Sequence, residues 1–481
     1  MVIGAGMGGL AAAIDLARAG CAVTVLERAA HPGGKVRAVD VAGRAVDTGP
    51  TVFTMRWLFE DLFRDAGAAL GERLGLEPLD VLARHGWVDG GRLDLHADLD
   101  RSVAAISEFA GAGQGEAYRR FAKRSRTMFE TLDHSFMRRE KPGPVALPLS
   151  LGLAGLPRLA ATKPFTSLWR ELGRCFADPR LRQLFGRYAT YCGSSPWAAP
   201  ATLMLIAHAE RAGVWTVDGG MPRLAEALAA LAAEHGVEVR LGEGAARIEA
   251  PGGRAAAVVT DAGERLASDA VVFNGDVAAL GAGLLGDEVR RAVAPRPDDP
   301  RSLSAITWSV VGTARGFPLH HHTVLFGTDY RDEFEALFGR GEVTDEPTVY
   351  LCAQDRKNGA PPESPERLLL LVNAPPRTLA AADIDAVEAR TFDFLARHGL
   401  RIDTDAAVRT TPADWAERFP GSDGAIYGWP THGWRGTFKR SGARGAVRGL
   451  YFAGGTVHPG PGIPMAAQSG RIAARAVLAD F

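Results

Sequence analysis

The stretch VIGAGMGGLAAAIDLARAGCAVTVLE, residues 2–27, decides the fold. Its apolar spacing predicts the end of a strand, then a helix over residues 9–19, then a nearly continuous apolar strand over residues 22–26. The pattern GxGxxG between strand and helix is filled by Gly4, Gly6 and Gly9. Glycines in this pattern allow a tight turn, a close approach of the backbone to a diphosphate, and close helix–strand packing. The stretch therefore predicts the first βαβ unit of a dinucleotide-binding fold.

The contacts that this unit would make with a dinucleotide follow from the same pattern. The diphosphate is expected at the helix N-terminus, where free N–H groups and the helix dipole favour negative charge. Glu27 closes the second strand, where a carboxylate accepts hydrogen bonds from ribose hydroxyls. A chance cluster of glycines is the competing interpretation, and the strand, helix and acidic residue around it disfavour it. The predicted contacts are Gly4, Ala5, Gly6, Gly8, Gly9 and Glu27.

A second glycine-rich turn, HPGGK at residues 31–35, follows the acidic residue. Such a turn brings backbone and a basic side chain towards the dinucleotide, at the spacing seen in flavin oxidoreductases. A simple nicotinamide enzyme does not need this element, so it favours FAD over NAD. A plain Pro-Gly-Gly loop is the competing interpretation. The contacts predicted from this turn and from DTGPT (47–51) are Gly34, Lys35 and Thr51.

The end of the chain is expected to return to the same cofactor. GLYFAGG (449–455) predicts a strand that runs into a glycine turn, and a helix follows over residues 463–479. The N-terminus of this helix would face the pyrimidine carbonyls of the flavin, which gain negative charge on reduction. A loop of this kind without a ligand would expose much unpaired backbone. The predicted contacts are Gly454, Gly455, Gly462, Ile463, Pro464 and Met465.

Only one GxGxxG motif follows a predicted strand, so a second bound nucleotide is not expected. The electrons should therefore leave FAD for an acceptor other than a bound nicotinamide. Oxygen, a quinone and a membrane electron-transfer chain all stay open.

Bulk composition excludes several classes of protein. The chain has 481 residues, a formal net charge of -1 and 46% hydrophobic residues, and it lacks the basic surplus of nucleic-acid-binding proteins. Its 4 cysteines form no CxxC pair, which predicts reduced thiols rather than disulfides or a metal site. No signal peptide and no apolar run of roughly 18 residues is visible, so neither export nor a membrane span is expected. Very little of the first strand precedes Gly4, so this strand is short or upstream residues are missing.

Longer segments resemble the bacterial carotenoid desaturases of the phytoene desaturase type, over essentially the whole chain. These segments are DTGPTVFTMRWLFEDLF (47–63), HHTVLFGTDYRDEF (321–334), PTVYLCAQ (347–354), TPADWAERF (411–419) and GTVHPGPGIP (455–464). Four further stretches look like one subgroup, the 1-hydroxycarotenoid 3,4-desaturases, also called methoxyneurosporene dehydrogenases. They are residues 187–215, 219–229, 424–434 and 458–471.

The resemblance implies an α/β fold: a Rossmann-like FAD-binding domain of the amine oxidase and carotenoid desaturase type, with an inserted substrate domain of sheet and helices. By pattern, residues 57–214 are rich in helix, and residues 301–375 alternate as strands do. The FAD-binding domain is expected to comprise residues 1–70, 215–285 and 420–481. The substrate and membrane-associated domain is expected to comprise residues 71–214 and 286–419.

The subgroup implies the introduction of a C3–C4 double bond into an acyclic 1-hydroxy or 1-methoxy carotenoid such as 1-hydroxyneurosporene. C4 is allylic to the polyene, so hydride loss from C4 to FAD leaves a delocalised cation, and loss of a C3 proton completes the bond. Three alternatives stay open: phytoene desaturase or another carotenoid desaturase, a flavin amine oxidase, and a non-catalytic carotenoid carrier.

No catalytic acid or base is predicted, because the cation itself makes the C3 proton acidic. His320, His321 and His322 are the most prominent candidates, but neighbours in a strand face opposite sides, so the three cannot all line one site. A structural or solvated role is favoured, and no metal site is expected.

A carotenoid must be drawn from a bilayer, so peripheral contact with the inner, photosynthetic membrane from the cytoplasmic side is expected. The segment at 142–165 is rich in Leu, Ala and Pro and is flanked by basic residues, which suits insertion at the lipid headgroups. An ordinary helix pair of the second domain is the equal alternative for this segment. The flanking basic residues are Arg138, Arg139, Lys141 and Lys163.

Overall fold

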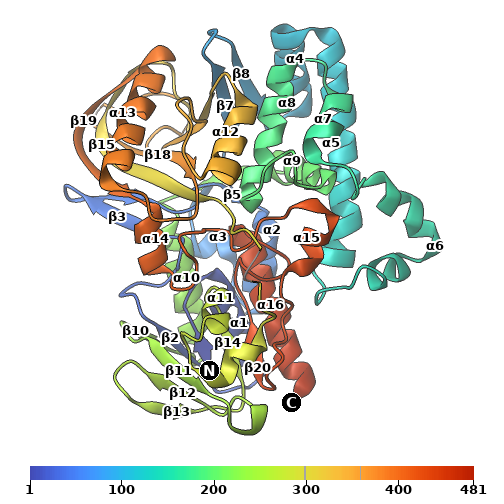
Figure 1. The fold of residues 1–481 in the computed structure, drawn as a ribbon, viewed down its shortest axis with the longest axis vertical. Helices are drawn as coiled ribbons and strands as arrows, with labels where there is room; N and C mark the ends of the chain where they lie inside the picture. Colours follow the sequence, from blue (N-terminus) through green and yellow to red (C-terminus); the bar gives the residue numbers. More distant parts are fainter. Residues whose placement is uncertain (297–298, 358, 364) are drawn as a thin grey trace.

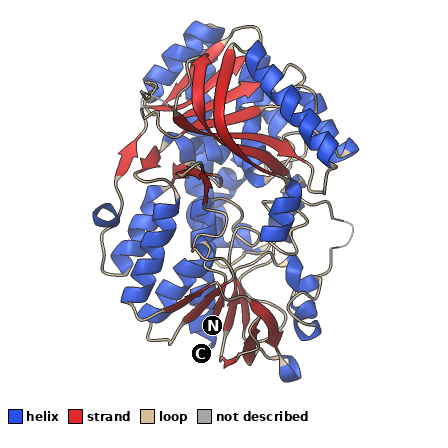
Figure 2. Ribbon diagram, turned by 90° about the vertical axis from the view of Figure 1, so that its left-hand side faces the viewer, coloured by secondary structure: helices blue, strands red, loops and turns tan. Residues whose placement is uncertain are grey.

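The computed structural model describes residues 1–296, 299–357, 359–363 and 365–481 of the chain. Two large sheets lie at opposite ends of the molecule, and both termini lie at the end with the smaller, parallel sheet (Figure 1). Figure 2 shows the two sheets one above the other, with loops and helices between them.

The smaller sheet is the one predicted from the opening stretch. Its strand order is β10-β2-β1-β14-β20, and all neighbours are parallel. The short β1 lies in the middle, where Val2 stands opposite Val25 on one side and Val272 on the other. Helices α1, α10 and α16 pack together on one face of this sheet. The bounds are β1 Val2–Ile3, α1 Met7–Arg18, β2 Thr24–Glu27, α10 Pro222–Glu234, β10 Glu238–Leu241, β14 Val271–Phe273, β20 Leu450–Phe452 and α16 Ile463–Asp480.

The opposite face of the parallel sheet is covered by a small antiparallel sheet of order β11-β12-β13. Ile3, Leu26 and Phe273 from the parallel strands share one buried cluster with Ile248 and Val258 from the small sheet. The central strands β1 and β14 and the neighbouring β20 are therefore buried on both faces and are apolar, whereas the edge strand β10 is partly exposed and carries Glu238 and Arg240. The bounds are β11 Ala245–Glu249, η4 Pro251–Gly253, β12 Ala257–Thr260, β13 Arg265–Ala267, α11 Ala278–Gly281 and η5 Asp287–Ala292.

The larger sheet is mixed, with the order β19-β15-β18-β17-β16-β7-β8. Its neighbours are antiparallel except β16 and β7, which run parallel. Helix α13 packs its apolar face, including Val387 and Phe394, against the sheet. The bounds are β7 Val81–Trp87, β8 Arg92–His96, β15 Ser304–Gly316, β16 His322–Phe326, β17 Val349–Ala353, β18 Glu366–Ala374, α13 Ala381–Arg397 and β19 Leu400–Thr410.

Two parts of this sheet differ from the sequence prediction. Residues 76–96 lie in the stretch predicted to be rich in helix, but they form β6, β7 and β8. Strand β7 lies inside the larger sheet, paired with β16 more than 200 residues away, and side chains on both of its faces are buried, so its sequence shows no local alternation. Strand β19 carries mostly polar, exposed side chains at the sheet edge, and no strand pattern was evident there.

A layer of helices packs beside the larger sheet, and its core contains Phe121, Phe176, Phe185 and Tyr188. Helix α6 extends away from this layer (Figure 1). The bounds are α4 Leu99–Ala110, α5 Ala112–Leu132, η1 Asp133–Met137, α6 Ala146–Ala161, α7 Leu168–Cys175, α8 Pro179–Gly186, η2 Arg187–Cys192, η3 Ala201–Met204 and α9 Leu205–Arg211.

A three-stranded sheet of order β5-β9-β6 joins the two parts. All strands of the parallel sheet fall within residues 1–70, 215–285 and 420–481, whereas β9 runs across the boundary at residue 214. We propose these segments as the cofactor unit. The remaining bounds are β3 Ala38–Val41, β4 Arg44–Asp47, β5 Phe53–Thr54, α2 Arg56–Asp65, α3 Leu70–Arg73, β6 Leu76–Pro78, β9 Val214–Val217, α12 Tyr330–Glu335, η6 Ala336–Arg340, α14 Pro412–Arg418 and α15 Gly433–Lys439.

Candidate active site

The turn between β1 and α1 leaves a glycine-lined surface. Gly4 has a φ of +98° and donates its N–H to Leu26 O at 2.7 Å, so the chain turns sharply out of the sheet. A Cβ on Gly9 would lie 2.0 Å from Gly4 O, which shows how closely the helix packs on the turn. No side chain caps α1 at Gly6. The N–H groups of the first helical turn are therefore available to an anion.

Glu27 is buried at the carboxyl end of β2. Its Oε2 accepts the Ala5 N–H at 2.8 Å, and its Oε1 accepts the Ala29 N–H at 2.9 Å. The carboxylate thus helps to hold the glycine turn itself. A carboxylate has about four acceptor positions, so acceptor capacity is left for a ribose hydroxyl.

The HPGGK turn folds onto the glycine turn. Gly33 donates its N–H to Ala5 O at 2.8 Å, and a Cβ on Gly34 would lie 3.3 Å from Gly6 Cα. Lys35 points inward and donates its Nζ to Ile426 O at 2.6 Å. The structure therefore brings the GxGxxG turn and the HPGGK turn into direct contact.

Buried cations surround Lys35. Burial lowers the pKa of Lys35 to about 8, Asp276 raises it, and the charges of Arg301 and Arg440 lower it further. Arg440 is also buried, and this burial lowers its pKa to about 10. Of these charges, Arg301 pairs with Asp276 at 2.7 Å, so the described residues of the group hold a surplus of positive charge. Such a surplus suits a diphosphate or an electron-rich ring.

The DTGPT segment lies beside this group. Asp47 accepts the Met221 N–H at 2.8 Å, and burial raises its pKa to about 6. A Cβ on Gly49 would lie 1.9 Å from Lys35 O, so this segment and the HPGGK turn touch through backbone. Thr51 places its hydroxyl 2.6 Å from the Tyr350 hydroxyl and lines the large cavity described below.

The C-terminal motif packs against the first helix. Gly454 donates its N–H to Ser469 Oγ at 2.7 Å, and a Cβ on Gly470 would lie 1.9 Å from Gly8 O. Gly462 has a φ of +108° and precedes α16, whose N-terminus has no side-chain cap. Ile463, Pro464 and Met465 form the first turn of α16 and line the cavity, while Gly455 lies next to Pro461.

Asn274 was not predicted, yet it lies at the centre of these turns. Its Nδ2 donates to Gly4 O at 3.0 Å, and a Cβ on Gly6 would lie 2.9 Å from the same atom. Its Oδ1 is buried without a partner and would lie 2.6 Å from a Cβ on Gly8. The one sequence signal is its position directly after the buried strand β14, at the carboxyl edge where α/β sheets bind ligands.

A cavity of about 380 Å³ is lined by Gly49, Pro50 and Thr51 and by the first turn of α16. Most of its wall is apolar and comes from α5, η1, α6 and α9, including Phe129, Phe136, Leu147 and Ile206. A polar part of the wall comes from η2, α9, β17 and the segment before β20. Its members are Arg187, Thr190, Tyr191, Glu210, Tyr350, Tyr427 and Arg440.

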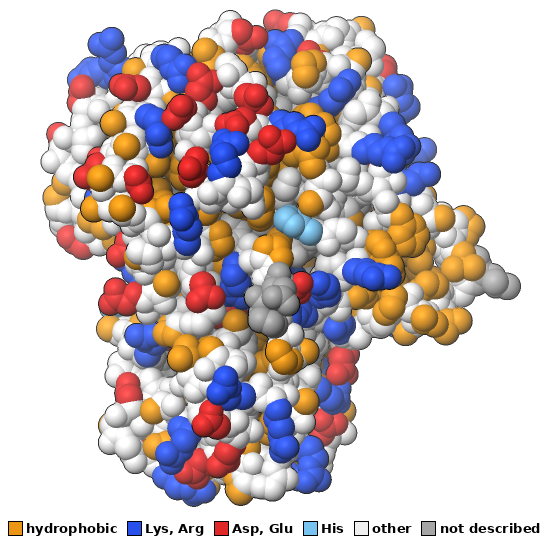
Figure 3. Space-filling model, viewed as in Figure 1, with side chains coloured by type: hydrophobic (Ala, Val, Ile, Leu, Met, Phe, Trp, Pro, Cys, Tyr) orange, Lys and Arg blue, Asp and Glu red, His pale blue; other side chains and the backbone are white. Residues whose placement is uncertain are grey.

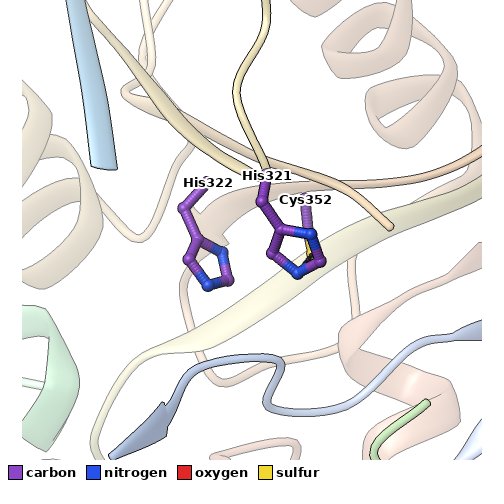
Figure 4. A group of neighbouring side chains, drawn as sticks. All are labelled: His321, His322 and Cys352. Atoms are coloured by element: carbon purple, nitrogen blue, oxygen red, sulfur yellow. Dashed lines mark hydrogen bonds between the residues drawn. The ribbon is translucent and has the colours of Figure 1, made fainter. Parts of the chain in front are cut away.

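The histidine run does not line this cavity as a unit. His320 lies 3.9 Å from Asp94, whereas His321 and His322 lie together beside Cys352 (Figure 4). His322 Nδ1 is 2.7 Å from the Tyr350 hydroxyl, and burial lowers its pKa well below the usual value. His321 and His322 are thus neutral at pH 7, and His322 contacts Tyr350 of the cavity wall. The cysteines are free thiols, of which Cys21 is exposed.

The residues of the glycine cradle fit a bound dinucleotide. The glycine turns approach one another through backbone, α1 and α16 begin without a side-chain cap among the described residues, and the buried cations near Lys35 exceed their counter-charges. These features explain why the first and last motifs of the chain converge on one place.

The family model for flavin containing amine oxidoreductases matches residues 7–478. Hydroxyneurosporene desaturase of Rubrivivax gelatinosus is 48% identical over 100% of this chain and 93% of its own length. Phytoene dehydrogenase of Streptomyces griseus is 35% identical over 99% of this chain and 94% of its own length. A solved putrescine oxidase structure covers 99% of this chain and 97% of its own, with a TM-score of 0.62 at 14% identity, which supports the fold alone. The chain therefore belongs to the flavin-containing amine oxidoreductases and, within them, to the carotenoid desaturases, and it is an FAD-dependent oxidoreductase.

Proposed function

We propose that the protein introduces the C3–C4 double bond into an acyclic 1-hydroxy or 1-methoxy carotenoid. One observation carries the proposal: a single cavity joins the loop at Gly462–Met465 to helix α6. Leu147 and Leu159 of α6 line this cavity, while Leu149 of the same helix is exposed. An apolar rod can thus pass from the protein surface to the motifs that would hold FAD. The names of the relatives with full coverage support a hydroxyneurosporene-type substrate.

The proposed roles of the chain follow from the geometry. Gly4, Gly6 and Gly9 with the N-terminus of α1 would hold the diphosphate, and Glu27 would accept from the ribose. Lys35 and the N-terminus of α16 would face the anionic parts of the flavin. The remaining contacts proposed for FAD are Ala5, Gly8, Gly34, Thr51, Gly454, Gly455, Gly462, Ile463, Pro464 and Met465.

Bound FAD supplies the acceptor for a hydride from C4 of the substrate. The apolar wall of Phe129, Phe136 and Ile206 excludes water and holds the polyene in one orientation. The C3 proton is then lost from a delocalised cation, and the electron pair of the C3–H bond becomes the new double bond. No strong base is needed for this loss, and we assign none.

An amine oxidase activity is disfavoured by the charges of the cavity wall. Arg440 is buried and lines the cavity, whereas the charge of Arg187 is balanced by Glu210 in the same wall. A protonated amine would have to approach the buried cation of Arg440, which costs electrostatic free energy. A neutral carotenoid meets no such cost.

Anaerobic incubation of the FAD-loaded protein with 1-hydroxyneurosporene in liposomes tests the proposal. We expect bleaching of the flavin absorption and a product that has lost two hydrogen atoms and absorbs at longer wavelength. Phytoene should react poorly, because its short triene delocalises the C4 cation less well. Ready turnover of phytoene without turnover of 1-hydroxyneurosporene would assign the protein to a different desaturase step.

We also propose that α6 and its flanks contact the membrane surface. No helix in the described ranges is long and apolar enough to cross a bilayer. Yet Val145 is 71% exposed, Leu149 75% and Phe165 78%, and apolar side chains gather over α6 in the space-filling view (Figure 3). Arg139 and Lys163 are exposed beside this patch, whereas Arg138 is paired with Asp133 at 3.0 Å. Apolar side chains with basic neighbours suit anionic headgroups.

Co-sedimentation with anionic liposomes tests the membrane contact. We expect the double change Leu149→Glu and Phe165→Glu to lower binding roughly tenfold or more, because two large apolar side chains each contribute about 1.5–3 kcal/mol on burial. Leu241→Glu is the matched control, since Leu241 is exposed at 42% on β10, outside this patch. Equal binding of both variants would show that the bilayer does not contact α6.

A further inference from the structure

Four residues form a buried polar cluster in the otherwise apolar part of the molecule: Arg187, Tyr188, Tyr191 and Glu210. The Glu210 carboxylate accepts from the Tyr188 hydroxyl at 2.7 Å and from the Tyr191 hydroxyl at 2.5 Å. Arg187 donates its Nη1 to the Tyr191 hydroxyl at 2.8 Å, and its Nη2 lies 3.8 Å from Glu210. A buried ion pair of this kind seldom adds stability in proportion to its desolvation cost, so another role is expected.

The cluster has hydrogen-bonding capacity that the protein does not use. Arg187 is 6% exposed, and its Nη2, 3.8 Å from Glu210, donates no hydrogen bond to any described residue. Burial lowers the pKa of Arg187, but Tyr191 and Glu210 outweigh it and hold the pKa above the usual value, so the guanidinium is charged. A charged N–H donor without a partner is costly unless a ligand or a water accepts from it.

The cluster lines the same cavity as the proposed flavin contacts. Arg187, Tyr191 and Glu210 all belong to the cavity wall, as do Thr51 and Met465. Tyr350 connects the two groups. Its hydroxyl lies 2.6 Å from Thr51 Oγ1, and although burial raises its pKa most strongly, the charge of Arg187 opposes that rise.

Another part of the cavity wall is apolar. Leu132, Phe136, Met137 and Leu147 form one buried cluster there, against which Leu151 and Leu159 of α6 pack. A long substrate that enters along α6 with its apolar chain on this wall can place its leading end at the polar cluster. Only C2 and C3 separate the reacting C4 from C1, so an oxygen on C1 must lie close to the reacting bond.

We propose that Arg187, Tyr191 and Glu210 form the binding site for the oxygen on C1 of the carotenoid. The inference rests on the proposed desaturase function and adds the residues that select its substrate. Arg187 Nη2 donates to the oxygen, and a tertiary hydroxyl donates in turn to Glu210 or to the Tyr191 oxygen. A 1-methoxy group accepts in the same way but cannot donate, so it binds less tightly. These residues act in specificity, not in the hydride or proton transfer.

The geometry also explains why the selection should be strong. When a substrate analogue lacks the hydroxyl, the buried polar groups that would bind it stay unpaired, and the analogue is therefore rejected. All three residues lie within the stretch 187–215, one of the segments that resembles the 1-hydroxycarotenoid subgroup. The cluster therefore offers a physical reason for a preference for 1-hydroxylated carotenoids. The names of the relatives describe such a substrate for those proteins.

The test compares a substrate that carries the C1 oxygen with one that lacks it, in the wild-type protein and in a variant of the cluster. The probes are 1-hydroxyneurosporene and 1,2-dihydroneurosporene, which has the same saturated C1–C2 bond without the oxygen. For the wild-type holoenzyme we expect kcat/KM to favour the hydroxylated probe roughly 10- to 100-fold, the range of a charged hydrogen bond. In the double variant Arg187→Met, Glu210→Gln the ratio of kcat/KM for the two probes should fall to within about threefold of one.

A matched control is the buried pair of Arg356 and Glu366, whose closest atoms lie 2.6 Å apart. Neither belongs to the described residues of the cavity wall. Arg356→Met with Glu366→Gln removes the same charges and should keep the full preference for the hydroxylated probe.

The outcomes separate the two proposals. If neither probe reduces the flavin of the wild-type protein, the desaturase function fails. If both probes react equally well in the wild type, or if the double variant keeps its preference, the site assignment is overturned while the desaturase function stands. Should the double variant not retain FAD, Tyr191→Phe decides alone: it keeps both charges and should lower the preference roughly three- to tenfold, as expected for one lost hydrogen bond, whereas an unchanged preference overturns the assignment.

Discussion

Replacement of Lys35 by methionine should have opposite effects on the flavin-free and the flavin-bound protein. Lys35 stands with its Nζ 2.6 Å from Ile426 O, next to the buried charges of Arg301 and Arg440. Burial lowers its pKa from 10.5 to about 8, so it is mostly protonated at pH 7 and destabilises the flavin-free fold. Methionine fills a similar volume without the charge.

The size of the effect follows from the shift. A difference of about 2.5 pKa units at about 1.4 kcal/mol each gives roughly 3 kcal/mol as an upper value. Lys35 is only partly enclosed and loses one hydrogen bond, so about 1–2 kcal/mol is the expected gain in the free energy of unfolding. Because a lowered lysine pKa penalises the protonated form, the gain is complete below pH 8 and disappears as the pH rises towards 10.5.

The flavin-bound protein should respond in the other direction. The anionic parts of bound FAD would compensate the cation, so the variant should bind FAD roughly 10- to 100-fold more weakly, as expected for a lost charged hydrogen bond. Urea unfolding of the flavin-free proteins at several pH values and titration with FAD measure both effects. A variant that is less stable than the wild type at pH 7, or that binds FAD equally well, would refute the reasoning.

Three further predictions concern the glycine turns. Gly6→Val should abolish FAD binding, seen as loss of the yellow holoprotein, whereas Gly71→Ala, at an open exposed position, should leave it intact. Glu27→Gln should weaken FAD binding by about 1–3 kcal/mol while turnover at saturating FAD survives, since glutamine cannot accept from both backbone N–H groups; a large fall in turnover at full occupancy would contradict this. Gly470→Ala should lower the free energy of unfolding by about 1–3 kcal/mol, because its Cβ would lie 1.9 Å from Gly8 O, and an unchanged denaturation midpoint would show that the helices separate freely.

Local chemistry made the cofactor unit predictable. The helix expected over residues 9–19 forms over Met7–Arg18, and the helix expected over residues 463–479 forms over Ile463–Asp480. Glycine turns, capping and apolar runs depend on neighbours in sequence, so these elements could be read directly. The family also followed from the sequence, because its segments are spread over the whole chain and match the desaturases.

The strands that the sequence pattern missed are those that pair with segments far along the chain. Strands β7 and β8 join the larger sheet because β7 pairs with β16, and the local pattern of residues 81–96 suggested helix instead. The separation of His320 from His321 and His322 likewise depends on where β16 begins. The pairing of β7 with β16 could not be derived from spacing, because it depends on a partner segment far along the chain.

The sequence by itself therefore determined the fold class, FAD as cofactor and membership of the carotenoid desaturases. Only the tertiary structure brought Arg187 and Glu210 into one cavity wall, placed Asn274 among the glycine turns and surrounded Lys35 with buried cations. The physical reason is that turns and helices are determined by short-range sterics and hydrogen bonds, whereas burial, unpaired donors and charge surplus arise only when distant segments exclude water together.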